Sequence, residues 1–162
     1  MQTCDIKRIF AIRYLNAPPF GGFGVLVMSS KIDEQKKAGA TFMENNKEKT
    51  GVVVLPEGLQ YEVLKQGSGA KPVITDTIKA HYKGALLDGK EFDSSFKRNQ
   101  PFSAPLRSLI KGWQIAIPLM NEGSHWRLWI PSELAYGDRG AGGDIPGGAT
   151  LLFEVELLQI LK

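Results

Sequence analysis

One segment of the chain has residue types and spacing that could bind a phosphate. Residues 84–90 (GALLDGK) match the spacing of a nucleotide-binding phosphate loop. The next residue is Glu91, where that loop requires a Ser or Thr hydroxyl to hold magnesium, and its carboxylate would repel a phosphate. Asp88 and Gly89, between alternating apolar residues, are instead typical of a tight hairpin turn with positive φ. The segment is therefore predicted to be a hairpin and not a nucleotide site.

Other residues could in principle support hydrolysis or metal binding. His81 and His125 are the two histidines, and each lies within an alternating strand pattern, which favours a structural role. Residues 93–95 (Asp-Ser-Ser) could supply two members of a hydrolytic triad, but no nucleophile-elbow sequence surrounds them and they are typical of a side-chain-capped turn. Cys4 is the single cysteine, so an intramolecular disulfide or a cysteine-based zinc site is excluded. We expect neither a metal nor a cofactor.

A set of aromatic and apolar residues is the remaining candidate for chemistry. Taken singly, each is explained as core. However, Gly112 and Trp113 fall where a short helix is expected to end, and Tyr136 opens a glycine-rich loop that runs to Gly148. Aromatic residues beside such loops tend to line pockets. The set comprises Tyr82, Phe92, Phe102, Ile110, Trp113, Tyr136, Ile145 and Phe153.

The chain divides into three parts by composition. Residues 1–29 are interpreted as a poorly ordered leader or a weak signal-like segment, residues 30–55 as a helical arm and linker, and residues 56–162 as a globular domain. A helix is expected from Ser30, a good N-cap, to Lys49. Its apolar face is thin, so the helix needs a partner surface.

Alternating apolar residues predict several antiparallel strands in the globular part. They lie around residues 59–63, 77–83, 123–131 and 149–161. The last run is apolar on both faces, which is typical of a central strand. One short helix is expected at residues 106–112. This pattern predicts an α+β fold with a helix on one sheet face and a helical arm in front.

Charge and hydropathy exclude two classes of partner. The formal net charge is +3, and all of it comes from residues 1–54, because residues 55–162 hold equal numbers of basic and acidic side chains. A nucleic-acid binder would carry a concentrated basic face. No stretch approaches the roughly 20 apolar residues that a membrane span needs. We therefore expect neither nucleic-acid binding nor a transmembrane helix.

Six motifs in one order along residues 56–162 identify a resemblance. They are HYKG (81–84), DGKEFDSS (88–95), RNQPF (98–102), IKGW (110–113), LAYG (134–137) and IPGGATLLFEVELL (145–158). In these motifs the chain resembles the FKBP family of peptidyl-prolyl cis/trans isomerases. The arm before Pro56 is similar to the end of the long helix in the bacterial macrophage infectivity potentiator subgroup.

The resemblance implies both a fold and a site. The fold would be a bent antiparallel sheet of about five strands wrapped around one short helix. Trp113 would form a floor for the proline ring, and the Ile110 N–H and the Tyr136 hydroxyl would bind substrate carbonyls. The implied catalytic residues are Tyr82, Asp93, Ile110, Trp113, Tyr136 and Phe153, and the implied substrate-binding residues are Phe92, Arg98, Phe102, Leu109 and Ile145.

The implied function is acceleration of X-Pro bond rotation by desolvation in an aromatic pocket. Proline-containing peptides and folding proteins would be the substrates, and macrolide immunosuppressants would fit the same pocket. The alternative is a non-catalytic chaperone or adaptor that binds proline-containing or unfolded chains. Residues 138–144 lack the aromatic, histidine and proline residues of some members, which leaves extended-substrate contacts in doubt.

Assembly and compartment follow less directly from the sequence. Members of the potentiator subgroup dimerise through a longer N-terminal helical domain, whereas residues 1–29 show no helical pattern, so a dimer through the arm is not assumed. The cytoplasm is the expected compartment because no convincing signal is present. The bacterial periplasm is the alternative if residues 1–29 are a signal.

Overall fold

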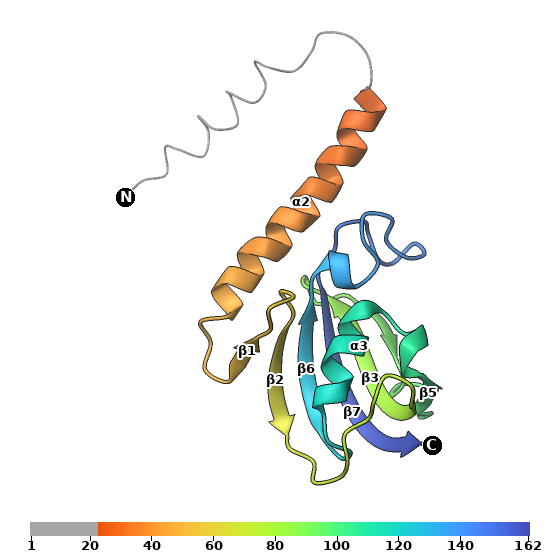
Figure 1. The fold of residues 1–162 in the computed structure, drawn as a ribbon. Coiled ribbons are helices and arrows are strands. Elements are labelled where there is room, and N and C mark those ends of the chain that lie inside the picture. Colours follow the sequence, from red (N-terminus) through yellow and green to blue (C-terminus); the bar gives the residue numbers. More distant parts are fainter. Residues whose placement is uncertain (1–22) are drawn as a thin grey trace.

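The computed structural model describes residues 23–162, in which a long helix runs diagonally above one end of a bent antiparallel sheet (Figure 1). The helices are α2 (Phe23–Asn46) and α3 (Lys111–Ala116), with single 3-10 turns at Leu106–Ser108, Ile117–Leu119 and Ser132–Leu134. The strands are β1 (Val52–Val54), β2 (Gln60–Lys65), β3 (Thr77–Leu86), β4 (Glu91–Ser94), β5 (Phe102–Pro105), β6 (His125–Ile130) and β7 (Leu151–Leu161). No helix among these described residues is long and apolar enough to cross a membrane.

The sheet is built around its two longest strands, β3 and β7. Within residues 23–162 its seven strands follow the order β1-β2-β6-β7-β3-β4, and β5 also pairs with β3. Leu151, Phe153, Val155 and Leu157 of β7 are all buried on one face, as a period of two requires. Strand β7 also pairs with β6 on one side and with β3 on the other, which confirms the expectation that this segment is a central strand.

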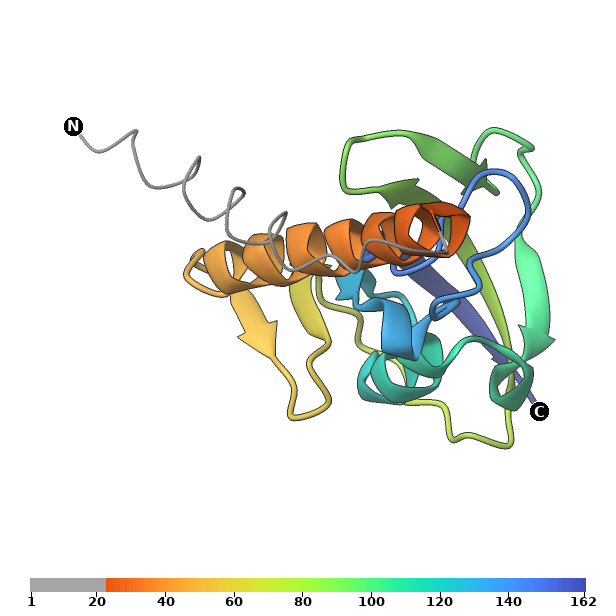
Figure 2. The ribbon, with the colours of Figure 1, turned by 90° about the horizontal axis from the view of Figure 1, so that it is seen from above.

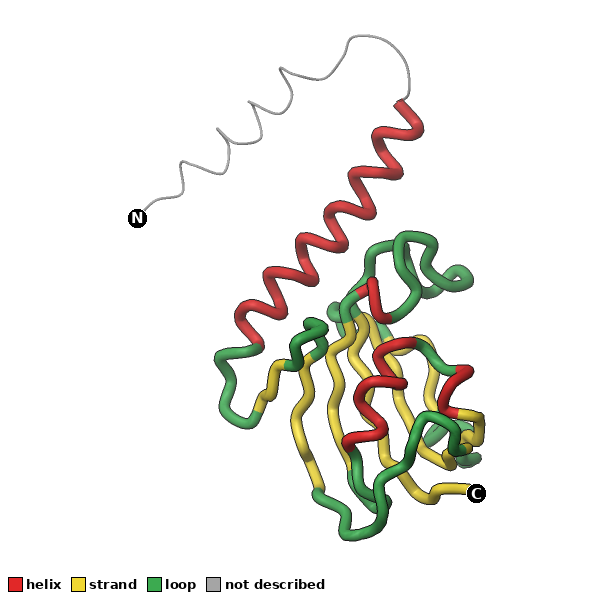
Figure 3. Tube along the Cα trace, in the orientation of Figure 1, coloured by secondary structure: helices red, strands yellow, loops and turns green. Residues whose placement is uncertain are grey.

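Helix α3 crosses one face of the sheet and closes the core (Figures 1 and 3). Its Trp113 and Ala116 are buried against Leu128 and Phe153 of the sheet. The helix can lie this close because Gly112 has no side chain, since a Cβ there would come within 2.5 Å of Ile130 Cγ2. The core thus lies between α3 and the sheet, and the start of α3 lies beside β3 and β4.

The α+β fold class is confirmed, with two differences in detail. The sheet has seven strands in the described chain, where about five were expected, because Val52–Val54 of the arm region pairs with β2 and because β5 forms a separate strand beside β3. The short helix occupies Lys111–Ala116 and not 106–112. Leu109 and Ile110 have extended backbone and separate the 3-10 turn at Leu106–Ser108 from α3. The Gln114 side chain of α3 donates a hydrogen bond to the Leu109 carbonyl at 2.6 Å.

Helix α2 begins earlier and ends earlier than the sequence predicted. It starts at Phe23, so Ser30 lies inside the helix and is not its N-cap. It ends at Asn46, whose buried amide donates to Gln60 Oε1 of β2 at 2.9 Å, and not at Lys49. That polar contact anchors the end of the helix to the sheet. Residues 1–29 were interpreted as a poorly ordered leader or a weak signal-like segment without a helical pattern. Residues 1–22 of this segment lie outside the described residues, whereas residues 23–29 form the first two turns of α2.

Seen from above, α2 lies across the domain next to the loop that joins β6 to β7 (Figure 2). The residues of α2 that face the domain are Ile32, Lys36, Gly39, Met43 and Asn46, which follow one another at steps of three or four. The partner surface that the thin apolar face of this helix requires is therefore the domain itself.

Candidate active site

Nine side chains from six separate parts of the fold enclose one cavity of about 110 Å³. Strands β3, β4, β5 and β7, the start of α3 and the loop after β6 each contribute. All nine were predicted from the sequence. They are Tyr82, Phe92, Asp93, Phe102, Leu109, Ile110, Trp113, Tyr136 and Phe153.

Trp113 forms the bottom of the cavity. It is only 4% exposed, and the rings of Tyr82, Phe102 and Phe153 meet its ring edge-on at centroid distances of 5.4, 6.3 and 5.5 Å. Edge-to-face contacts of this kind add stability beyond the area buried. The indole Nε1 has no hydrogen-bond partner among the described residues. The ring is therefore held by packing and presents an apolar surface to the cavity.

Gly84 makes room for two of the pocket walls. In the sheet it pairs with Asp93 of β4 on one side and with Phe153 of β7 on the other. A Cβ at this position would lie 2.5 Å from Phe92 Cζ and 2.8 Å from Phe153 Cε1. The two phenylalanine rings can meet edge-on at 5.6 Å only because this position lacks a side chain.

One carboxylate lies in this aromatic wall. The Tyr82 hydroxyl donates to Asp93 Oδ2, and Arg98 donates to Asp93 Oδ1. Burial acts to raise the pKa of the Asp93 carboxyl, but the hydrogen bonds from Tyr82 and Arg98 outweigh it, and the pKa falls below its ordinary value. Asp93 is therefore negatively charged at neutral pH although it faces an apolar cavity.

Two hydrogen-bond donors stand at the rim. Ile110 is the residue before α3, and its backbone N–H meets no acceptor among residues 23–162. The Tyr136 hydroxyl likewise has no partner within the described chain, and the ring is 38% exposed. Burial and the Asp93 charge raise the pKa of Tyr136, so the hydroxyl keeps its proton. The rim can donate to two carbonyl oxygens of a bound chain.

Two predicted site residues do not line the cavity. Arg98 lies beside it, with its guanidinium 5.9 Å from the Tyr82 ring centroid, and reaches the site through Asp93. Ile145 is 7% exposed and belongs to the hydrophobic core, and its backbone pairs with Ala141 across the loop. This pairing closes the part of the loop that follows Tyr136.

The motifs that were set aside as hydrolytic or nucleotide sites take the structural roles expected of them. Leu86 and Lys90 close a hairpin turn through a 2.8 Å backbone hydrogen bond, and Gly89 in that turn has φ +93°. His81 Nδ1 lies 2.8 Å from Ser95 Oγ, so it is a satisfied structural histidine. His125 differs, because its buried Nε2 has no hydrogen-bond partner among the described residues. Neither histidine lines the cavity.

A second hollow lies along the outer side of α2. It is wider, about 670 Å³, and its lining residues are Glu34, Lys37, Ala38, Thr41, Phe42 and Asn45. All of these come from a single helix, with one aromatic ring and no group of polar atoms converging on one point. The smaller cavity, in which six parts of the fold converge, is therefore the candidate active site.

Comparisons with known families agree with this geometry. Residues 68–158 match the family described as FKBP-type peptidyl-prolyl cis-trans isomerase. Residues 27–63 match the domain described as amino terminal to FKBP-type peptidyl-prolyl isomerase, which covers much of α2 together with β1 and most of β2.

Curated relatives include two bacterial proteins. The FKBP-type 22 kDa peptidyl-prolyl cis-trans isomerase of Escherichia coli is 51% identical over 123 residues, which are 76% of this chain and 60% of that protein. The outer membrane protein MIP of Legionella longbeachae is 42% identical over 134 residues, which are 83% of this chain and 58% of that protein. This chain thus spans between half and two thirds of the length of both.

Solved structures share the fold. The crystal structure of FkpA from Escherichia coli superposes with a TM-score of 0.80 at 30% identity and covers 99% of this chain and 83% of that one. A peptidyl-prolyl cis-trans isomerase from Pseudomonas syringae gives a TM-score of 0.75 at 41% identity, over 80% of this chain and 96% of that one. By its family match, its relatives and its fold, this chain belongs to the FKBP-type peptidyl-prolyl cis-trans isomerase family.

Proposed function

We propose that the chain catalyses cis/trans rotation of X-Pro bonds in peptides and folding proteins, with the aromatic cavity as its active site. Uncatalysed rotation is slow because it breaks amide resonance, a barrier of about 18–20 kcal/mol. The observation that carries the proposal is the combination of an apolar floor at Trp113 with an ionised carboxylate at Asp93 in one cavity. Family membership supports the same reaction.

The reaction needs no nucleophile, because no covalent bond to the enzyme has to form. As the amide twists, it loses its zwitterionic resonance form and becomes less polar than in the planar ground state. An apolar cavity that excludes water therefore binds the twisted amide better than the planar one, and this difference in binding lowers the barrier. A proline ring on Trp113 would place the bond among Tyr82, Phe102 and Phe153.

Each polar group of the site then positions a different part of the bound chain. The Ile110 N–H and the Tyr136 hydroxyl hold carbonyl oxygens of the bound chain at the rim. Asp93 is the polar group nearest the rotating bond, and Tyr82 and Arg98 keep it ionised and oriented. Phe92, Leu109 and Phe153 complete the dry wall. Ile145 acts through its pairing with Ala141 in the loop that carries Tyr136.

A protease-free assay of a short proline peptide tests the proposal directly. The chain should accelerate isomerisation, and Tyr136→Phe should lower kcat/KM by about tenfold because one rim donor is lost. Tyr61→Phe is the matched control, because Tyr61 lies on β2, stacks on Trp126 and is absent from the cavity lining. No acceleration by the wild-type chain would reject the catalytic function.

The competing function is a non-catalytic chaperone or adaptor, and the hollow on the outer side of α2 is the observation that favours it. Phe42 in that hollow offers an apolar contact beside the charged Glu34 and Lys37. A chaperone would suppress aggregation of an unfolded protein without turning over a short peptide. If the chain is a chaperone, the Phe42→Ala variant should no longer suppress aggregation and should keep any activity on the short peptide. If the chain is a catalyst of the proposed kind, Tyr136→Phe should slow isomerisation of the short peptide and of the unfolded protein equally.

The same cavity supports binding of macrolide immunosuppressants, which should compete with the proline peptide at Trp113.

Dimerisation would use α2, and sedimentation of the full chain tests it. A monomer would leave the outer hollow free for other chains.

We propose the bacterial periplasm in preference to the cytoplasm as the compartment, because the Legionella relative is named an outer membrane protein. Cell fractionation with N-terminal sequencing of the mature chain distinguishes the two compartments.

A further inference from the structure

Helix α2 approaches the loop between β6 and β7 so closely that one position of the helix has no space for a side chain. A Cβ on Gly39 would lie 2.1 Å from Thr150 Oγ1 and 3.0 Å from Thr150 Cβ. Glycine inside a helix costs about 1 kcal/mol relative to alanine. The contact with Thr150 gives a structural reason for this residue in the middle of an otherwise ordinary helix.

The loop residues that meet the helix, Gly147 and Gly148, have no side chains. A Cβ on Gly148 would lie 2.7 Å from the Ile32 carbonyl oxygen and 3.1 Å from Lys36 Cγ, and a Cβ on Gly147 would lie 3.3 Å from Ile32 Cγ1. The Lys36 ammonium forms an ion pair with Asp138 Oδ1 at 2.6 Å. The two surfaces therefore fit together over two turns of the helix.

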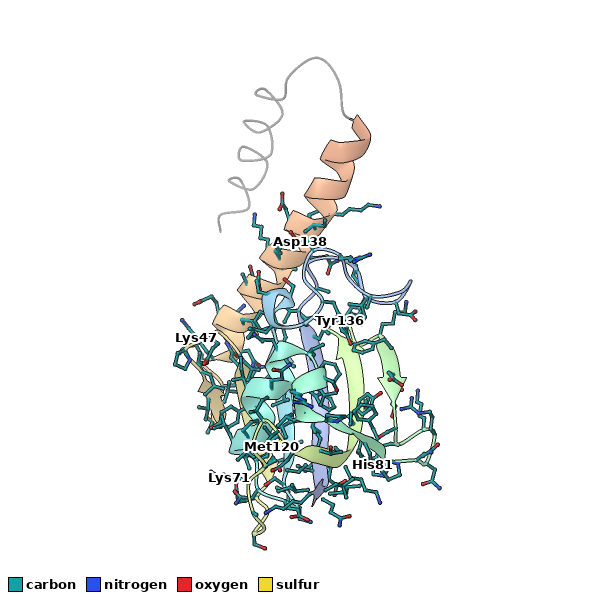
Figure 4. The ribbon with its side chains drawn as sticks, turned by 45° about the vertical axis from the view of Figure 1, so that its right-hand side comes forward. Lys47, Lys71, His81, Met120, Tyr136 and Asp138 are labelled. Carbon is teal, nitrogen blue, oxygen red and sulfur yellow. The ribbon has the colours of Figure 1, made fainter. Side chains whose placement is uncertain are left out.

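The same loop carries Tyr136 into the pocket. The Gly148 N–H donates to the Gly137 carbonyl at 2.9 Å, and the Gly140 N–H donates to the Tyr136 carbonyl at 3.2 Å. Asp138, which the helix holds, is two residues beyond Tyr136. In Figure 4 Asp138 lies against α2 and Tyr136 lies farther from it, toward the sheet. No hydrogen bond within the described chain fixes the Tyr136 hydroxyl, so its place at the rim depends on the backbone of the loop and on packing in the cavity wall.

We propose that helix α2 is a positioning element of the active site, with Gly39 and Lys36 as positioning residues that hold the loop so that Tyr136 stands at the rim. The expected change in kcat/KM rests on the function proposed above. The expected change in the order of the loop does not. It gives α2 a role in the reaction that a simple spacer between domains would not have.

The test uses Gly39→Ala in the full chain, because the new methyl would displace the helix from Thr150. Amide hydrogen exchange at Gly140 and Gly148 should become faster, and kcat/KM on a short proline peptide should fall by about threefold to tenfold. Ala40→Gln adds atoms at a neighbouring exposed position of the same helix, keeps a good helix former and should alter neither quantity.

A second pair of variants keeps the test independent of overpacking. Lys36→Ala removes the ion pair with Asp138, and Lys31→Ala removes a charge from an exposed residue of the same helix that lines neither cavity. Only the first should speed loop exchange and lower kcat/KM. Thr150→Ala, combined with Gly39→Ala, removes the atom at 2.1 Å and should restore part of the lost activity.

The outcomes separate this proposal from the proposed function. If Tyr136→Phe is already present, Gly39→Ala should cause little additional loss of kcat/KM, because both changes act on the same hydroxyl. Full additivity, or unchanged exchange in Gly39→Ala and Lys36→Ala, would overturn the positioning role. A wild-type chain without activity would reject the isomerase function, and the exchange measurements would still decide whether α2 holds the loop.

Discussion

The Tyr82 hydroxyl donates a hydrogen bond to Asp93 Oδ2 across the gap between β3 and β4. The bond joins the aromatic wall of the cavity to its carboxylate. Burial is the first influence on the Tyr82 pKa and raises it, and the hydrogen bond to Asp93 raises it further. Tyr82 therefore stays a donor and Asp93 stays an acceptor over the whole neutral range.

Replacing Asp93 with asparagine should lower kcat/KM by about tenfold or more and leave the fold intact. The change keeps the size of the side chain and removes the charge that Tyr82 and Arg98 orient. The measurement is the peptide isomerisation rate together with circular dichroism. Glu48→Gln, an equal charge change at an exposed residue after α2, is the control. An unchanged rate in Asp93→Asn would remove Asp93 from the mechanism.

Stability should fall in acid through Asp93. Its carboxyl pKa is lowered in the folded state, so the folded protein favours the charged form. The stabilisation is present above the ordinary Asp pKa of about 4 and is lost as pH falls through the lower folded value. Urea unfolding at a series of pH values measures this. The Asp93→Asn variant should lose less stability below pH about 4 than the wild type, and parallel curves would contradict the assignment.

Activity should be independent of pH across the neutral range. Burial raises the pKa of both Tyr82 and Tyr136, so neither hydroxyl loses its proton until pH exceeds the ordinary tyrosine value of about 10. With Asp93 already ionised, kcat/KM should stay flat between about pH 5 and 9. A bell-shaped profile centred near neutrality would indicate a titrating group that this site does not contain.

Trp113→Ala should impair both stability and activity. The buried indole contacts three aromatic rings, and its removal opens a cavity that costs about 3–5 kcal/mol of unfolding free energy. Trp113→Phe keeps a ring on the floor and should retain more of both. Urea unfolding and the peptide assay measure the two effects. A stable and fully active alanine variant would show that the proline ring does not rest here.

Gly84→Ala should damage the pocket more than a typical surface glycine change, because the new Cβ would press on Phe92 and Phe153. The expected result is a lower kcat/KM and weaker binding of proline peptides. Gly143→Ala is the control, since a Cβ there meets nothing within 4 Å. Equal kinetics for the two variants would contradict the close packing of the walls.

Much of the site was predictable because local chemistry and motif order carry it. The hairpin at Asp88 and Gly89 follows from turn preferences, and the period-two burial of β7 follows from alternation in the sequence. Seven of the nine lining residues had been singled out as aromatic or apolar residues near turns and the short helix, and the resemblance, which transfers positions along the chain, added Asp93 and Leu109. Ile145 was placed in the pocket by the same transfer; it lies in the hydrophobic core cluster that also contains Trp113 and Phe153, and its role in substrate binding stays a prediction.

The position of the short helix shows where local reasoning stops. Residues 106–112 have an acceptable helical composition, yet Leu109 and Ile110 are extended. Tertiary packing decides this conformation, because the extended residues allow Trp113 to enter the core while the Ile110 N–H stays at the rim of the cavity.

The amino-acid sequence by itself determined the strand alternation and the turns, since each depends on neighbours along the chain. Only the tertiary structure decided that Asn46 at the end of α2 meets Gln60 of β2 and that Gly39 of α2 meets Thr150 near the Tyr136 loop. Those contacts join residues far apart in sequence. They depend on how close two backbones come in space, and no local pattern records that distance.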